Sequence, residues 1–214
     1  MRVKLCSAAV VALHHRLLRS AAMSIRIALL CLFALLPSTC AFADTDRARL
    51  WELLLDGQHV ALMRHATAPG VGDPEGFRVD DCRTQRNLSE EGRRQARAIG
   101  ERFGANGIPR AAVFSSQWCR CLDTARLLGL GEVTPFAGLN SFFRDSGREA
   151  ASTAAVRALI ARESRPGRAL VLVTHQVNIT ALSGVYPASS EIVVLQVEGD
   201  KLSVAGQIPA EGAP

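Results

Sequence analysis

Two histidines follow apolar runs that are typical of buried strands. Arg64 and His65 come directly after the run at 60–63, and His175 comes directly after the run at 169–174. Reactive groups of α/β proteins gather where the strands of the sheet end. An imidazole can accept a phosphoryl group, and a guanidinium binds phosphate oxygens in a planar, two-point fashion. These residues therefore predict a phosphate site.

Strand-like and helix-like segments alternate along the chain and would position these residues. The predicted strands are 58–64, 111–114, 133–136, 169–174, 191–197 and 201–205. The predicted helices are 46–55, one that begins after Ser89, 118–128 and 150–163. This alternation predicts an α/β fold, a three-layer sandwich with a mostly parallel central sheet and helices on both faces. The last two strands flank a Glu-Gly-Asp turn and are expected to form an antiparallel hairpin.

A long segment without periodicity, residues 66–87, follows the first predicted strand and is rich in Gly, Pro and Asp. A loop of this length inside a compact domain is usually a lid or a binding segment. Ser89 can cap the helix that follows the loop. Small or apolar residues recur on one face of that helix from Gly92 to Phe103, which predicts that this face is buried.

Four ordered blocks of the sequence resemble the histidine phosphatase superfamily, which has the phosphoglycerate-mutase-like fold. The blocks are Arg64-His65-Ala66, Leu88-Ser89-x-x-Gly92-x-x-Gln95-Ala96, Ser115-Ser116-x-x-x-Arg120-x-x-x-Thr124-Ala125 and Thr174-His175. The resemblance implies that His65 is the nucleophile that receives the phosphoryl group. It also implies that Arg64 and Arg120 bind the phosphate oxygens and that His175 is the second phosphate-binding histidine. A covalent phosphohistidine would divide hydrolysis into two easier displacements.

The general acid that would protonate the leaving group departs from the family pattern. Many relatives carry Glu just after a Leu that follows the third strand, whereas here Leu139 is followed by Asn140. Asp145 is the predicted acid, with Glu149 and Asp73 as alternatives. A missing acid matters little when the leaving group is already good, as in a phosphoramidate or an anhydride.

The resemblance implies a metal-independent phosphohydrolase without a cofactor that acts on a small phosphorylated substrate. Two alternatives remain open at this stage. The first is a phosphoramidate or anhydride hydrolase, and the second is a phosphate-binding sensor that lacks turnover because it lacks the acid.

The first 43 residues have the features of an export signal. They contain no acidic residue, and the apolar stretch 27–36 follows Arg26 and precedes a small-x-small sequence at 41–43. We predict cleavage before Asp44, so that residues 44–214 form the mature domain and the protein is periplasmic or secreted.

The start and the fate of this leader allow alternatives. Met23 begins a complete leader by itself, so the true start is either Met1 or Met23. A lipoprotein attached through Cys40 is a weaker alternative, because the residues before Cys40 make a poor lipobox. A retained anchor needs about 20 apolar residues, more than this stretch offers, so no stable membrane anchor is expected.

Removal of the leader changes the charge of the chain. The leader holds five of the 25 basic residues, which leaves 20 basic against 20 acidic residues in the mature domain. The excess positive charge therefore belongs to the leader, and no binding to nucleic acid is expected. Lys201 is the only mature lysine, so the positive charge of the domain is almost entirely guanidinium.

Three cysteines remain after cleavage, in what should be an oxidising compartment: Cys82, Cys119 and Cys121. An odd number predicts one disulfide and one free thiol, with Cys82 joined to either of the other two. A zinc site is not expected, because Cys119-x-Cys121 lacks the spacing of a C-x-x-C pair.

Overall fold

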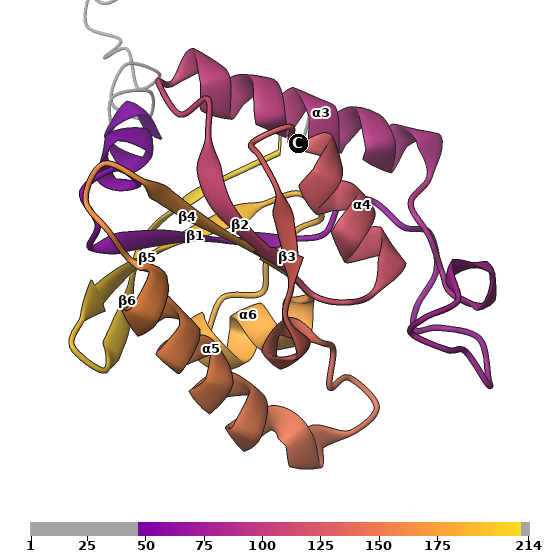
Figure 1. Cartoon of the computed structure of the whole chain (residues 1–214). Coiled ribbons are helices and arrows are strands. Elements are labelled where there is room, and N and C mark those ends of the chain that lie inside the picture. The colour runs from indigo at the N-terminus through magenta and orange to yellow at the C-terminus, as the bar shows by residue number, and fades with distance from the viewer. Residues whose placement is uncertain (1–46, 211–214) are drawn as a thin grey trace, which may run out of the picture. The chain divides into compact units, whose positions relative to one another are not determined.

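The computed structural model describes residues 47–210. The predicted leader lies outside these residues, and its cleavage stays a prediction. A six-stranded sheet in the order β3-β2-β4-β1-β5-β6 forms the centre of the domain (Figure 1). The strands are β1 His59–Arg64, β2 Ala111–Ser115, β3 Val133–Pro135, β4 Ala169–Thr174, β5 Ile192–Glu198 and β6 Lys201–Ile208.

The sheet is mostly parallel, as predicted. Strands β1 to β4 pair in parallel, while β5 pairs antiparallel with β1 and β6 pairs antiparallel with β5. The closing hairpin is therefore at one edge of the sheet. The carboxyl ends of β1, β2 and β4 all lie at the same edge, because these three strands run in one direction.

Helices cover both faces of the sheet and complete the three layers. The helical segments are 47–53, α3 Glu90–Ala105, α4 Cys119–Leu127, α5 Glu149–Glu163 and α6 Gln176–Ser183, with short 3-10 turns at η1 Cys82–Thr84, η2 Ala137–Leu139 and η3 Ser146–Arg148. Helices α3 and α4 lie on one face, whereas α5 and α6 lie on the other (Figure 1). The predicted three-layer α/β sandwich is confirmed.

The central strands are buried on both faces, which explains their continuous apolar runs. Successive side chains of a strand point to opposite faces of the sheet. Met63 of β1 packs in the same core cluster as Phe103 of α3, while its neighbour Leu62 packs in the cluster of Leu159 of α5. Two separate apolar layers therefore hold β1 in place just before Arg64.

Helix α3 is fixed against the segment that follows His65. The Ser89 side chain accepts a hydrogen bond from the Gly92 N–H at 3.0 Å and caps the helix. A Cβ added at Gly92 would lie 2.1 Å from the Thr67 carbonyl oxygen, so only glycine permits this approach. The Thr67 N–H also donates to the Gln95 side chain at 3.2 Å. The residues of the second block therefore hold α3 against the segment that follows His65.

Helix α6 is the element that the sequence did not predict. The segment Gln176–Ser183 contains several β-branched residues, which disfavour a helix when taken alone. Ile179 and Leu182 are buried in the core below the sheet, and Gly184 with φ 75° ends the helix. Packing therefore outweighs local propensity here, and it places His175 at the N-cap of the helix.

A disulfide joins the long loop to the start of α4. Cys82 in η1 is bonded to Cys119, while Cys121 is free and buried. The Gln85 side chain adds a second tie, since its oxygen accepts from the Cys119 N–H at 3.0 Å. One of the two predicted pairings is thus selected, and the loop is held beside Arg120.

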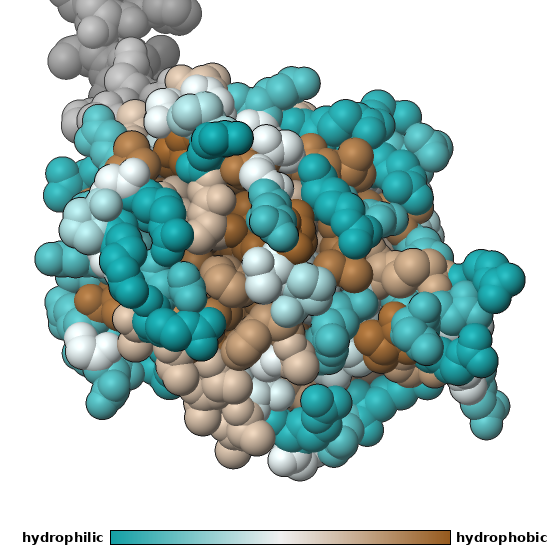
Figure 2. All heavy atoms as spheres, in the orientation of Figure 1, coloured by the Kyte–Doolittle hydropathy of each residue, from teal (hydrophilic) through white to brown (hydrophobic). Residues whose placement is uncertain are grey.

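The face in the orientation of Figure 1 carries hydrophilic side chains around its margin and apolar ones towards its centre (Figure 2).

Within residues 47–210, no helix combines the length and the apolarity that a membrane span requires.

Candidate active site

The parallel pairing of β1 with β4 brings the two strand-end histidines together. Arg64 and Thr174 are partners in the register, and the His65 N–H donates to the Thr174 carbonyl at 2.9 Å. The imidazole rings of His65 and His175 lie 5.5 Å apart between centroids in an edge-to-face arrangement. His65 and His175, which are 110 positions apart in the sequence, therefore share one site, as the strand-end pattern predicted.

The hydrogen bonds of His65 define its tautomer. Nδ1 lies 2.8 Å from the Ala66 carbonyl oxygen, which can only accept, so Nδ1 carries the proton. The lone pair is then on Nε2. Burial first, and the nearby Arg120 and Arg64 charges next, lower the pKa of His65 to about 3. The ring is therefore neutral at ordinary pH, which is the state that a nucleophilic imidazole requires.

His175 is fixed through both ring nitrogens. Nε2 lies 2.9 Å from the Ser116 hydroxyl, and Nδ1 lies 3.4 Å from Nη2 of Arg120, which can only donate. Nδ1 is therefore the acceptor, and Nε2 carries the proton of the neutral ring. Burial, followed by the charge of Arg120, lowers the pKa of His175 well below its usual value.

Arg120 is held by four hydrogen bonds and keeps one donor free. Nη1 donates to Asp73 Oδ1 at 2.8 Å and to the Arg86 carbonyl at 3.4 Å. Nη2 donates to Asp73 Oδ2 at 3.1 Å and to His175 Nδ1 at 3.4 Å. The fifth donor, Nε–H, is buried and has no partner. The guanidinium is thus preorganised at the wall of the cavity, with one buried N–H unpartnered.

Arg64 presents a second donor of this kind. Its Nη1 donates to the Pro187 carbonyl at 2.8 Å, whereas its Nε–H is buried without a partner. Buried donors without partners are rare in folded proteins and need an explanation. A phosphate oxygen accepting from Arg64 and Arg120 would satisfy both groups.

Arg86 is a third guanidinium at the site, and the sequence analysis did not single it out. Its Nε donates to the Gly72 carbonyl at 2.8 Å, and Nη1 donates to the Ala68 carbonyl. Burial, followed by the charge of Arg120, lowers the pKa of Arg86. Arg86 lies two residues before Leu88 of the second block, and this position is the signal from which the sequence could have indicated a role at the site.

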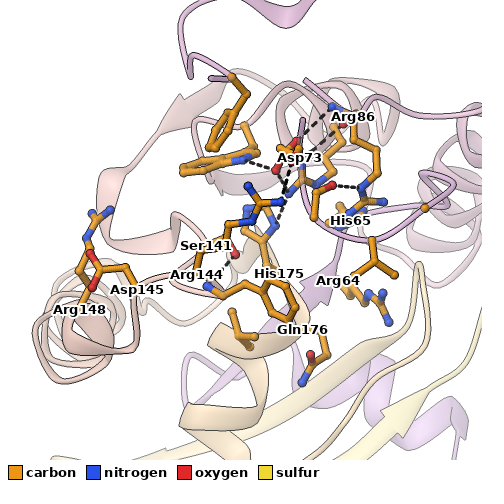
Figure 3. Close-up of a pocket in the computed structure, with 18 of the residues that line it drawn as sticks. Arg64, His65, Asp73, Arg86, Ser141, Arg144, Asp145, Arg148, His175 and Gln176 are labelled. Carbon is orange, nitrogen blue, oxygen red and sulfur yellow. Dashed lines mark hydrogen bonds and ion pairs between the residues drawn. The ribbon is translucent and has the colours of Figure 1, made fainter. Parts of the chain in front are cut away.

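These groups line a cavity of about 300 Å³ at the carboxyl ends of the strands (Figure 3). The lining residues come from the carboxyl ends of β1 and β4, the long loop, the start of α4, the segment before α5, the first turn of α6 and the chain that follows α6. They are Arg64, His65, Gly70, Val71, Gly72, Asp73, Phe77, Arg86, Trp118, Arg120, Ser141, Phe143, Arg144, Asp145, Arg148, His175, Gln176, Val177 and Tyr186. The side-chain amide of Gln176 donates to Thr180 Oγ1 at 2.7 Å.

The Asp73 carboxylate is fully engaged. Besides Arg120, it accepts from the Trp118 indole at 3.0 Å and from the Arg86 backbone N–H at 3.1 Å. Burial alone would raise the pKa of Asp73, but the hydrogen bonds and charge of Arg120 outweigh burial and lower it. Asp73 is therefore an ionised partner of Arg120 in this structure rather than a proton donor.

The other two predicted acids, Asp145 and Glu149, are exposed. Asp145 lines the cavity but is exposed, and Figure 3 shows it beside Arg148 on the opposite side from His65. Glu149 begins α5, is exposed and is not part of the lining. The role of Asp145 as general acid stays a prediction.

Asn140, which stands near the position where relatives carry Glu, has a supporting role. Its side-chain oxygen accepts from the Ser116 hydroxyl at 3.2 Å and from the Gln117 N–H at 2.8 Å. Ser116 in turn contacts His175. Asn140 is buried, so it steadies the hydrogen-bond chain behind His175.

His59 lies at the opposite end of β1 from His65. Its Nδ1 is 2.7 Å from Asp56 Oδ2, and the residue is not part of the cavity lining. In residues 47–210, no group of three or more His, Cys, Asp or Glu side chains is arranged to hold a metal ion.

Two buried neutral histidines make the stability of the domain depend on pH. A histidine with a lowered folded pKa binds a proton more readily when unfolded, so stability is complete above about pH 6.5 and falls below it. Between pH 6.5 and 4.5, His65 alone should cost about 2 to 3 kcal/mol of the free energy of unfolding. Urea unfolding at several pH values measures this loss, and it should shrink in His65→Asn. An equal loss in both proteins would contradict the assignment.

Comparison with known families agrees with this geometry. Residues 60–141 match the model of the histidine phosphatase superfamily, branch 1, a region that contains His65 and Arg120. The predicted resemblance to this superfamily is confirmed over this stretch, which contains three of the four blocks. No curated protein matches the sequence.

Solved structures share the fold at low sequence identity. The protein histidine phosphatase SixA complexed with tungstate is 16% identical, with a TM-score of 0.52 over 71% of this chain and 96% of that one. Rv3214 from Mycobacterium tuberculosis is 19% identical, with a TM-score of 0.53 over 72% and 98%. The phosphoserine phosphatase of Entamoeba histolytica in complex with 3-phosphoglyceric acid is 12% identical, with a TM-score of 0.52 over 72% and 98%. These likenesses establish the fold.

Proposed function

We propose that the protein is a phosphohydrolase that forms a phosphohistidine on His65. The observation that carries the proposal is the neutral, buried His65 ring with its Nε2 lone pair free, beside two guanidiniums that each keep a buried N–H unpartnered. The match of residues 60–141 to the histidine phosphatase superfamily model supports the same activity.

In the first step, Nε2 of His65 attacks phosphorus, and the bond from phosphorus to the leaving group breaks. The leaving group departs with the electron pair of that bond. Arg64, Arg120 and Arg86 stabilise the phosphoryl oxygens, whose charge is redistributed during transfer. His175 accepts from Arg120 through Nδ1 and so helps to hold this guanidinium in place during transfer.

In the second step, water attacks phosphorus of the phosphohistidine. The bond from phosphorus to Nε2 breaks, its electron pair returns to His65, and a proton from the water is released with the phosphate product. Neither step uses a metal ion or a cofactor in this proposal.

Phosphate release from 4-nitrophenyl phosphate tests the proposal. The protein should show steady turnover after a burst of nitrophenol equal to the enzyme concentration. A binding sensor would take up phosphate or tungstate without any turnover, and this result would replace the proposal with the sensor.

A second candidate is a hydrolase of phosphoramidates or anhydrides. The positions of the two cavity carboxylates favour this candidate, because neither is placed to act as an acid. Asp73 is bound to Arg120, and Asp145 lies away from His65. Without an acid near the leaving group, only substrates with good leaving groups should react quickly.

A series of substituted phenyl phosphates separates these candidates. We expect kcat to rise steeply as the leaving group becomes more acidic, and Asp145→Asn should leave this dependence unchanged. A shallow dependence that becomes steep in Asp145→Asn would instead identify Asp145 as the general acid and favour a phosphomonoesterase with poor leaving groups.

Asp73 should influence catalysis by holding Arg120. We expect Asp73→Asn to lower kcat by about 10- to 100-fold, because Arg120 loses a charged two-point partner, while KM changes little. Asp80→Asn is the matched control, since Asp80 is an exposed residue of the same loop. A rise in kcat would show that Asp73 instead competes with phosphate.

We also propose that the protein acts outside the cytoplasm, in the periplasm or as a secreted enzyme. The leader-like features of residues 1–43 support this location, and the Cys82–Cys119 disulfide is compatible with an oxidising compartment. The expected partner is a small phosphorylated substrate, without nucleic acid and without a stable membrane anchor.

A further inference from the structure

Exposed hydrophobic side chains gather at the mouth of the active-site cavity. Among residues 47–210, four large hydrophobic side chains are exposed, and three of them line this cavity. Val71 is 87% exposed, Tyr186 73% and Phe143 58%. The fourth, Val204 on β6, is outside the lining. Single exposed hydrophobic residues are ordinary, but a group around one opening marks a binding surface.

The backbone around Val71 and Phe143 is tied together beside the phosphate site. Val71 lies two residues before Asp73, which binds Arg120. Phe143 precedes Arg144, whose Nη2 donates to the Asp73 carbonyl oxygen at 2.9 Å. These contacts keep the two apolar side chains on the same opening, although they come from segments 72 positions apart.

Tyr186 is tied to the phosphate site from the third side. Its neighbour Pro187 accepts the hydrogen bond from Arg64 Nη1 at 2.8 Å. The three exposed apolar residues therefore line one cavity, each next to a residue that is hydrogen-bonded to the phosphate site or to the loop holding Asp73. Below them, Phe77 and Trp118 also line the cavity, with ring centroids 5.6 Å apart.

The cavity thus combines buried guanidiniums with three exposed apolar side chains, and the exposed residues Arg144, Asp145 and Arg148 line it as well. Its volume of about 300 Å³ is at the small end of ligand sites, which suits a phosphate group and about one or two rings. Apolar walls gain free energy from an apolar ligand and gain none from hydroxyl groups that would lose their water.

We propose that the substrate carries an apolar, ring-containing leaving group that packs against Val71, Phe143 and Tyr186. This inference rests on the proposed phosphohydrolase function and adds the chemical class of the substrate. An aryl or similarly flat apolar group packs well on aromatic side chains, whereas the hydroxyl groups of a polyol gain nothing from these three apolar residues.

Two substrates with good leaving groups test the proposal: 1-naphthyl phosphate and acetyl phosphate. In the triple variant Val71→Ser, Phe143→Ser, Tyr186→Ser, the ratio of kcat/KM for the naphthyl to the acetyl compound should fall at least about 10-fold. Val204→Ser, the matched control, should keep the ratio of the unchanged protein. An equal loss on both substrates, or no loss on either, would overturn the proposal.

A binding measurement keeps the inference testable even without turnover. Calorimetry with 1-naphthylmethylphosphonate and methylphosphonate gives the Kd ratio of an apolar and a small ligand that share the phosphonate group. The naphthyl compound should bind at least about 10-fold more tightly, and the triple variant should lose most of this preference. If the protein binds with this preference but hydrolyses neither substrate, the proposed function fails while the inferred apolar contact stands. A preference that is absent, or that survives in the triple variant, refutes this contact.

Discussion

His65→Ala should lower kcat on 4-nitrophenyl phosphate by about 10⁴-fold or more, since it removes the atom that forms the covalent intermediate. Nε2 of His65 carries the free lone pair, and no other histidine of the cavity has this arrangement, because both nitrogens of His175 are engaged. Steady-state release of nitrophenol measures the loss. The same variant should accumulate no phosphohistidine when the reaction is stopped in alkali, in which that bond survives.

The matched control is His59→Ala, on the same strand. His59 lies at the other end of β1, is bonded to Asp56 and is not part of the cavity lining, so its removal should leave kcat within about threefold of the unchanged protein. Thermal unfolding of both variants shows whether they fold. If folded His65→Ala retains turnover, the covalent mechanism is wrong.

Elements with strong local patterns were predictable from the sequence. The apolar runs of β1 and β4 and the capped, one-sided helix α3 follow from short-range physical rules. The alternation of these elements led to a parallel sheet, and that sheet placed His65 beside His175. Helix α6 was not predicted because several of its residues favour a strand locally, whereas the packing of Ile179 and Leu182 stabilises the helix.

The residues that the sequence did not reveal are positioned by contacts between distant segments. Arg86 was not predicted, and Asp73 was predicted only as an alternative acid, because both lie in a loop without periodicity, where no local rule indicates where a side chain points. The disulfide of Cys82 with Cys119 and the ion pair of Asp73 with Arg120 bring this loop onto α4. The engagement of Asp73, which decides against its role as a proton donor here, is likewise a tertiary property.

Arg120→Lys should lower kcat by about 10²- to 10³-fold even though it keeps the positive charge. Lysine has three rotatable donors on one nitrogen, whereas Arg120 uses four N–H groups to fix its plane at the cavity wall and keeps the fifth buried without a partner. A lysine ammonium that pairs with Asp73 therefore has no fixed donor left for the phosphoryl group. The loss should fall mainly on kcat, because Arg64 and Arg86 still attract the phosphate dianion.

Arg126→Lys is the control, because Arg126 lies on the same helix with a 61% exposed side chain and pairs only loosely with Asp123 at 3.6 Å. Its kcat should stay within about twofold of the unchanged protein. Tungstate binding by calorimetry completes the comparison: an Arg120→Lys protein that is folded, binds tungstate normally and turns over at the full rate would remove Arg120 from the transferring phosphoryl group. In that case the unpartnered Nε–H of Arg120 would need another explanation, and Arg64 with Arg86 would carry the stabilisation alone.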